Sequence, residues 1–180
     1  MTFGSELAFT PLHHLSAWQA FLNDGMRMRP YLDARQPPQE LGRAIDAAVA
    51  RQVRGWLEGV VDPKKFGEPD GRRWLPRREG FSWGGKSGSV DSDRDDKAES
   101  ALFVAFGPVE EPEVVVLIVV QRPDHAAGSR GEERFSGSRA AGPAAGRILE
   151  RALELRGLVA PRANLDSTPL AATLRTQEPR

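Results

Sequence analysis

The segment Val114–Gln121 constrains the fold of this 180-residue chain more than any other segment. Its apolar residues follow one another without a polar face, which is typical of a buried strand in the centre of a sheet. Ala101–Phe106 predicts a second strand, and residues 107–112 predict the turn that joins the two. Gly80–Val90 is a third strand candidate. We expect these strands to form an antiparallel sheet.

Three helices are predicted around these strands. Thr10 followed by Pro11 is a good helix start, and residues 23–25 (Asn-Asp-Gly) end this first helix. Apolar residues at helical spacing predict a second helix from about Gln39 to Val61 and a third from Pro143 to Arg156. The remaining long segments are predicted as loops at 62–79, 91–99 and 122–142 and as a disordered tail at 161–180.

Element order and composition narrow the class of protein. The order of helix, helix, three strands and helix predicts one α+β domain over residues 1–160, with a partial antiparallel sheet flanked by helices. The 25 basic and 25 acidic residues balance, so the charge does not predict nucleic-acid binding. The chain has no cysteine, and its three histidines form no metal-site pattern. We therefore expect neither a metal nor a cofactor.

Targeting signals are not visible in the sequence. The N-terminus does not have the pattern of a signal peptide. The longest strongly apolar run, Val114–Val120, is far shorter than the ~20 residues that a membrane helix needs. We expect no membrane segment in these 180 residues.

The segment Gly84–Ser89, Gly-Gly-Lys-Ser-Gly-Ser, carries the candidate chemistry. The simplest interpretation is a Gly/Ser-rich turn with a solvated lysine. A second is a phosphate-binding loop, because Gly80–Ser87 matches G-x-x-x-x-G-K-[ST]. Its surroundings disfavour that hypothesis, since the charged segment Arg72–Glu79 precedes it and a poor helix start at residues 88–93 follows. A third interpretation is the Lys-[Thr/Ser]-Gly-[Thr/Ser] strand of serine transpeptidases.

Several segments in the same order resemble the C-terminal part of the transpeptidase domain of class B penicillin-binding proteins. Residues 4–12 (GSELAFTPL) are similar to a Thr-Pro-Leu-Gln segment of that family, with His13 in place of the usual Gln. Residues 101–123 resemble its two-strand unit, and Gly142-Pro143-Ala-Ala resembles the start of its last helix. The family's Ser-x-x-Lys and Ser-x-Asn motifs do not occur in the 180 residues. By the resemblance, they would lie upstream of Met1.

The resemblance implies a role for each residue of the motif. Lys86 would supply positive charge at the strand edge and favour the carboxylate of the substrate. Ser87 would point away from the cleft, because side chains alternate along a strand. Gly88 would allow close approach of the ligand backbone. Ser89 would bind the carboxylate through its hydroxyl, and its N–H would form half of an oxyanion hole.

The implied function is D,D-transpeptidation in peptidoglycan cross-linking, through an acyl-enzyme on a serine. The stem peptide of peptidoglycan and β-lactams would be the ligands, and the family acts at the cell envelope, on the periplasmic face of the membrane. Because Ser-x-x-Lys does not occur in the chain, we expect the chain alone to be inactive. The alternative from another class is a non-catalytic fragment that binds a partner through its exposed sheet edges and helix faces.

Overall fold

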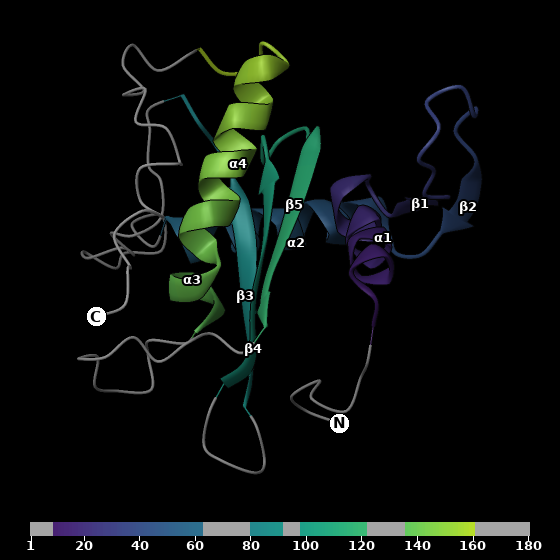
Figure 1. Ribbon diagram of the computed structural model, residues 1–180. Helices are drawn as coiled ribbons and strands as arrows, with labels where there is room; N and C mark the ends of the chain where they lie inside the picture. The colour runs from purple at the N-terminus through teal and green to yellow at the C-terminus, as the bar shows by residue number, and fades with distance from the viewer. Residues whose placement is uncertain (1–8, 63–79, 92–97, 122–135, 161–180) are drawn as a thin grey trace, which may run out of the picture.

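The computed structural model describes residues 9–62, 80–91, 98–121 and 136–160 (Figure 1). The predictions for 63–79, 92–97 and 122–135, and for the tail at 161–180, lie outside the described residues. Within the described part, the predicted α+β class is confirmed: helices pack on antiparallel sheets.

The larger sheet contains β3 (Gly84–Asp91), β4 (Ala98–Gly107) and β5 (Val114–Gln121) in the order β3-β4-β5. Both pairs of neighbours are antiparallel, as predicted. The predicted bounds of β5 are confirmed, but its predicted central position is wrong: among the described residues β5 pairs only with β4, which is the central strand. The predicted burial is wrong as well: no residue of β5 is fully buried, and Val119 is 40% exposed. An apolar run shows that a strand packs in a core, and it does not show how many strands pair with it or how completely its two faces are covered.

The first helix, α1 (Pro11–Leu22), begins where the sequence predicts. The Thr10 hydroxyl accepts a hydrogen bond from the His13 backbone N–H at 3.2 Å, so it caps the helix. The last helix, α4 (Gly142–Leu155), also agrees closely with the prediction. A short helix that was not predicted, α3 (Gly137–Ala140), precedes α4 within the segment assigned to a loop.

The second helix, α2 (Ala47–Val61), begins eight residues later than predicted. Glu40–Arg43 instead forms strand β2, which pairs antiparallel with β1 (Met26–Met28). Gly42 has a φ of +98°, which is incompatible with a right-handed helix. The Asp46 carboxylate accepts a hydrogen bond from the Ala48 N–H at 2.7 Å and caps the helix at its observed start.

Helices cover the two faces of the larger sheet (Figure 1). On one face, α4 packs on β4 and β5, and Phe103, Leu149 and Leu153 are fully inaccessible to solvent. On the other face, α2 packs against β3, and the Trp18 ring of α1 lies 6.3 Å from the ring of Phe106. The core therefore fixes β3 on both faces, while one of its long edges has no partner strand among the described residues.

Arg54 of α2 joins three separate segments. Its side chain is buried, and Nη1 donates to the Phe21 carbonyl at 3.0 Å and to Asp24 Oδ1 at 2.8 Å. Nη2 donates to the Glu110 carbonyl, in the turn between β4 and β5, at 3.3 Å. A cavity of about 230 Å³ adjoins this arginine, and none of the motif residues 86–89 line it. We interpret Arg54 as a structural link between α1, α2 and the sheet.

Asp24→Asn should lower the free energy of unfolding near neutral pH, because it removes the carboxylate that binds Arg54. The hydrogen bond from Arg54, aided by the charges of Arg54 and Arg51, holds the pKa of Asp24 below its usual value of 3.8. A lowered folded-state pKa stabilises the fold above the ordinary value, and the contribution is lost as the pH falls toward the folded-state value. Urea unfolding should therefore separate the two proteins near neutral pH, and the difference should shrink as the pH is lowered below 3.8.

The Asp33–Arg35 pair of the β1–β2 hairpin is the control for that experiment. The Arg35 side chain is 90% exposed, so Asp33→Asn should leave the unfolding free energy nearly unchanged at either pH. An equal loss of stability in the two variants would contradict the role assigned to Arg54.

Candidate functional site

The motif residues lie on β3, an edge strand of the larger sheet. Cross-strand partners share a face of the sheet, so the register assigns each side chain to a face. Lys86 pairs with Val104, on the face that α2 covers. Ser87 pairs with Phe103 and Ser89 with Ala101, on the face that carries α3 and α4. Lys86 and the two serines therefore leave the strand on opposite faces.

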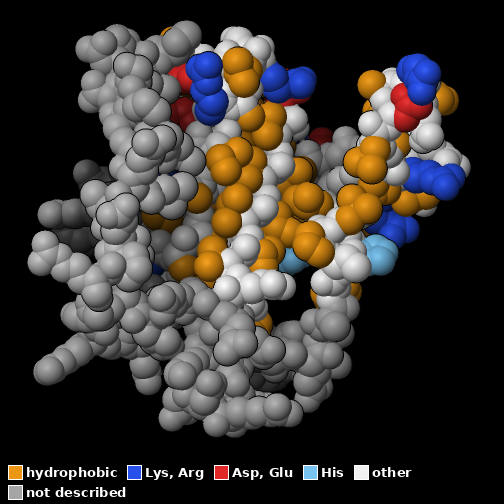
Figure 2. All heavy atoms as spheres, viewed as in Figure 1, with side chains coloured by type: hydrophobic (Ala, Val, Ile, Leu, Met, Phe, Trp, Pro, Cys, Tyr) orange, Lys and Arg blue, Asp and Glu red, His pale blue; other side chains and the backbone are white. Residues whose placement is uncertain are grey.

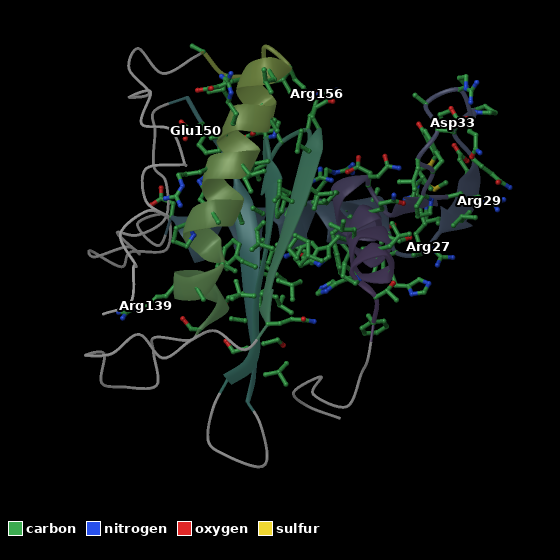
Figure 3. All side chains as sticks on the ribbon, viewed as in Figure 1. Arg27, Arg29, Asp33, Arg139, Glu150 and Arg156 are labelled. Atoms are coloured by element: carbon green, nitrogen blue, oxygen red, sulfur yellow. The ribbon has the colours of Figure 1, made fainter. Side chains whose placement is uncertain are left out.

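Lys86 is exposed, and its ammonium donates a hydrogen bond to the Ser87 carbonyl at 2.6 Å. Among the described residues it forms no ion pair with a carboxylate. The charged residues of the β1–β2 hairpin lie elsewhere: Figure 3 shows Arg27, Arg29 and Asp33 on that hairpin, well away from the larger sheet. Lys86 thus places a positive charge beside the edge of β3 that has no partner strand in the described residues. No described carboxylate neutralises this charge.

Ser89 is exposed, and its hydroxyl oxygen accepts a hydrogen bond from the Gly137 backbone N–H at 3.0 Å. Ser87 is half-buried on the same face. The alternation that predicts Ser87 opposite Lys86 also places Ser89 opposite Lys86. The motif therefore presents its lysine and its hydroxyls around one strand edge, and not side by side on one face.

The glycines of the motif have packing roles that the sequence did not reveal. A side-chain carbon on Gly84 would lie 2.5 Å from Cζ of Phe106, and one on Gly85 would collide with the Phe103 ring. At Gly88, the same atom would come within 3.0 Å of Leu102 Cδ1. These glycines let large side chains of β4 cross beside β3 on both faces. Close approach of a ligand at Gly88 stays a prediction.

The phosphate-loop alternative is wrong. A phosphate-binding loop must wrap its backbone amides around an anion and then open a helix. Here Gly84–Ser87 lie within a regular strand paired to β4, and the same strand continues to Asp91. The rings of Phe106 and Phe103 also occupy the space beside Gly84 and Gly85. The turn interpretation fails for the same reason, because the motif forms strand and not turn.

Among the described residues, no group of three or more His, Asp and Glu side chains could hold a metal ion. His13 lies at the start of α1, where its Nδ1 is 3.0 Å from the Thr10 hydroxyl. None of the helices in the described ranges has the length and apolar character needed to cross a membrane.

Sequence reasoning missed Gly137 as a neighbour of the motif. Forty-eight positions separate it from Ser89, and it lies in a segment predicted to be a loop. The available signal is the small residue pair Ser136-Gly137 just before the last helix. Small residues there allow α3 to approach the sheet closely, but the sequence alone does not say which strand it approaches.

A three-stranded antiparallel sheet with Lys-Ser-Gly-Ser on its edge strand and helices on both faces defines an α+β fold of the serine transpeptidase class. Residues 1–150 match the family model described as "Penicillin binding protein transpeptidase domain". The chain therefore belongs to this family, and its resemblance to class B penicillin-binding proteins is confirmed.

Two curated relatives give the extent of the match. The probable peptidoglycan D,D-transpeptidase PbpC of Pseudomonas aeruginosa is 29% identical over 178 residues, covering 96% of this chain and 28% of the relative. The probable peptidoglycan D,D-transpeptidase FtsI of Caulobacter vibrioides is 30% identical over 171 residues, covering 87% of this chain and 28% of the relative. The chain thus spans little more than a quarter of the length of these relatives.

Solved structures agree with the fold. The transpeptidase domain of Burkholderia pseudomallei penicillin-binding protein 3 is similar with a TM-score of 0.58 at 29% identity, over 83% of this chain and 42% of that one. Penicillin-binding protein 3 of Mycobacterium tuberculosis, in complex with ampicillin, is similar with a TM-score of 0.64 at 22% identity, over 92% of this chain and 38% of that one. The second likeness shows the fold alone.

Proposed function

We propose that this chain supplies the carboxylate-binding and oxyanion strand of a peptidoglycan D,D-transpeptidase. The observation that carries the proposal is the Lys-Ser-Gly-Ser sequence on the edge strand β3, with the Lys86 ammonium exposed and unpaired by any described carboxylate. Membership of the penicillin-binding transpeptidase family and the names of the relatives support it.

Lys86 and Ser89 would bind the carboxylate of a D-Ala-D-Ala terminus, or the matching carboxylate of a β-lactam. An ammonium attracts a carboxylate, and a hydroxyl with a free proton can donate to the same group. Both residues lie on the edge strand β3, and their side chains project from its opposite faces. A ligand that lies along the edge can contact both, whereas a ligand on one face can contact only one.

The Ser89 N–H would contribute to the oxyanion hole. Backbone groups two residues apart on a strand point in the same direction. The Ser89 N–H therefore points to the same side of β3 as the Ser87 carbonyl, which accepts a hydrogen bond from the Lys86 ammonium. Donors placed at the oxygen where charge develops are worth on the order of 10²–10³ in rate. Ser89 would therefore serve the reaction through its hydroxyl and through its backbone.

The nucleophile would come from outside these 180 residues. No serine of the chain is followed by lysine three positions later. A serine activated by such a lysine would attack the carbonyl between the two D-alanines, release the terminal D-alanine, and pass the acyl group to an amine of a neighbouring stem peptide. The chain alone would then be inactive. The assembled site would act at the cell envelope, on the periplasmic face of the membrane.

A labelled penicillin tests this proposal. We expect no covalent adduct with the isolated chain, because the attacking serine is missing. We expect an adduct with a hybrid protein in which this chain replaces the matching segment of the Pseudomonas aeruginosa relative, because that relative is named a probable peptidoglycan D,D-transpeptidase. Gel fluorescence and intact mass measure the adduct, and circular dichroism verifies that the hybrid is folded.

Two results would contradict the proposal. A folded hybrid that forms no adduct would remove the catalytic role and favour the alternative of a non-catalytic binding fragment. That alternative draws on exposed apolar side chains, among them Val119 of β5 and Ile148 of α4, which are 40% and 49% exposed. Figure 2 shows apolar side chains along α4 and in the space between α4 and α1. An adduct on the isolated chain would instead mean that a serine within it is reactive.

A further inference from the structure

The hydrogen bond between Gly137 and Ser89 joins the motif strand to the segment before the last helix. The Gly137 N–H donates to the Ser89 hydroxyl oxygen at 3.0 Å. Gly137 is buried, whereas Ser89 is exposed at the sheet edge. The contact therefore connects the interior of the domain to the residue that the proposed function assigns to carboxylate binding.

The bond determines what the Ser89 hydroxyl can do. A serine hydroxyl has one proton to donate and two lone pairs that accept. The Gly137 N–H uses one lone pair, and within the described ranges the hydroxyl donates to no acceptor. Its proton is then available for a ligand oxygen. A side chain that is already held in place also loses less rotational freedom when a ligand binds.

Only glycine can hold this N–H in its place. A side-chain carbon on Gly137 would collide with the carbonyl of Leu102 on β4, and would lie 2.5 Å from the carbonyl of Gly88 on β3. Both obstacles are backbone atoms of a paired sheet, so neither can rotate away as a flexible side chain would. Any larger residue must push α3 off the sheet and lengthen the bond to Ser89.

We propose that Gly137 is a positioning residue that orients the Ser89 hydroxyl as a hydrogen-bond donor to the carboxylate of the ligand. The inference rests on the proposed function, because it assumes that β3 binds a carboxylate. The inference adds Gly137, from a different part of the chain, to the proposed site. Ser89 touches the ligand, and Gly137 acts through Ser89.

Amide hydrogen exchange on the full 180-residue chain tests the contact itself. The Gly137 amide should exchange slowly in the unaltered chain and in Ser89→Thr, which keeps the hydroxyl. In Ser89→Ala it should exchange about tenfold faster, since a lost hydrogen bond of about 1–1.5 kcal/mol corresponds to that factor. Equal exchange in all three chains would overturn the inference. This arm needs no ligand and no substitution at the glycine.

Binding of N-acetyl-D-alanyl-D-alanine, followed by amide chemical shifts, tests the consequence. Ser89→Ala and Gly137→Ala should each weaken binding about tenfold or more, as expected for loss of a hydrogen bond to a charged group. Combining them should weaken binding no further than Ser89→Ala alone, because Gly137 acts only through Ser89. Ser89→Thr should retain binding, and Gly55→Ala, whose added carbon meets no atom within 4 Å, should leave binding unchanged.

The outcomes separate the two hypotheses. If the unaltered chain gives no saturable shifts at residues 86–89, carboxylate binding by this strand fails, and the inference fails with it. If the unaltered chain binds but Gly137→Ala weakens binding further in the Ser89→Ala background, the proposed function stands and the positioning role is overturned. A purely structural effect of Gly137 would produce that additive result.

Discussion

Lys86→Ala in the hybrid protein should lower the second-order rate of acylation by labelled penicillin about 10²-fold, comparable to the loss of one preorganised donor at an active site. The ammonium is exposed on the edge of β3, and its only described hydrogen bond goes to the neighbouring Ser87 carbonyl. Removing it takes away the positive charge that favours the ligand carboxylate. Because the side chain is exposed, the free energy of unfolding should change little.

Two further variants show whether the acylation rate depends on the position of the Lys86 charge or on the net charge of the protein. Lys86→Arg keeps a positive charge at the same place and should recover part of the rate, although a planar guanidinium has a different geometry. Arg29→Ala removes the same charge from the β1–β2 hairpin, far from β3 (Figure 3), and should leave the rate unchanged. Equal losses for Lys86→Ala and Arg29→Ala would contradict a local role and point to a general effect of net charge.

Leu149→Ala should lower the free energy of unfolding by about 2–5 kcal/mol, the usual range for a fully buried leucine. Leu149 of α4 has no exposed surface and packs in the core with Phe103 and Ala145. Its truncation leaves a cavity between α4 and the sheet, which the regular strands cannot close. Urea unfolding followed by tryptophan fluorescence measures the change, since Trp83 belongs to the same core.

Ile148→Ala is the matched control because it removes a similar side chain from the neighbouring position of the same helix. Ile148 is 49% exposed, so its truncation should cost far less than that of Leu149. If the two substitutions destabilise the chain equally, the orientation of α4 on the sheet is not the one described.

Local sequence patterns were sufficient for elements whose determinants lie close together in the chain. Thr10 and Pro11 fix the start of α1, and the run of apolar residues fixes the bounds of β5. Both are decided by neighbouring residues, through capping for α1 and through an unbroken apolar run for β5. The start of α2 was mispredicted because Glu40–Arg43 pairs with β1, a partner outside the local window.

The sequence by itself determined the family and the candidate motif, since Lys86–Ser89 can be read in order along the chain and the matching segments follow in the family's order. Only the tertiary structure decided that β4, and not β5, is the central strand of the sheet formed by the described residues. It alone assigned α2 to the face of Lys86 and brought Gly137 to Ser89. Strand order and long-range hydrogen bonds depend on which distant surfaces pack together, and no local pattern of residue types encodes that choice.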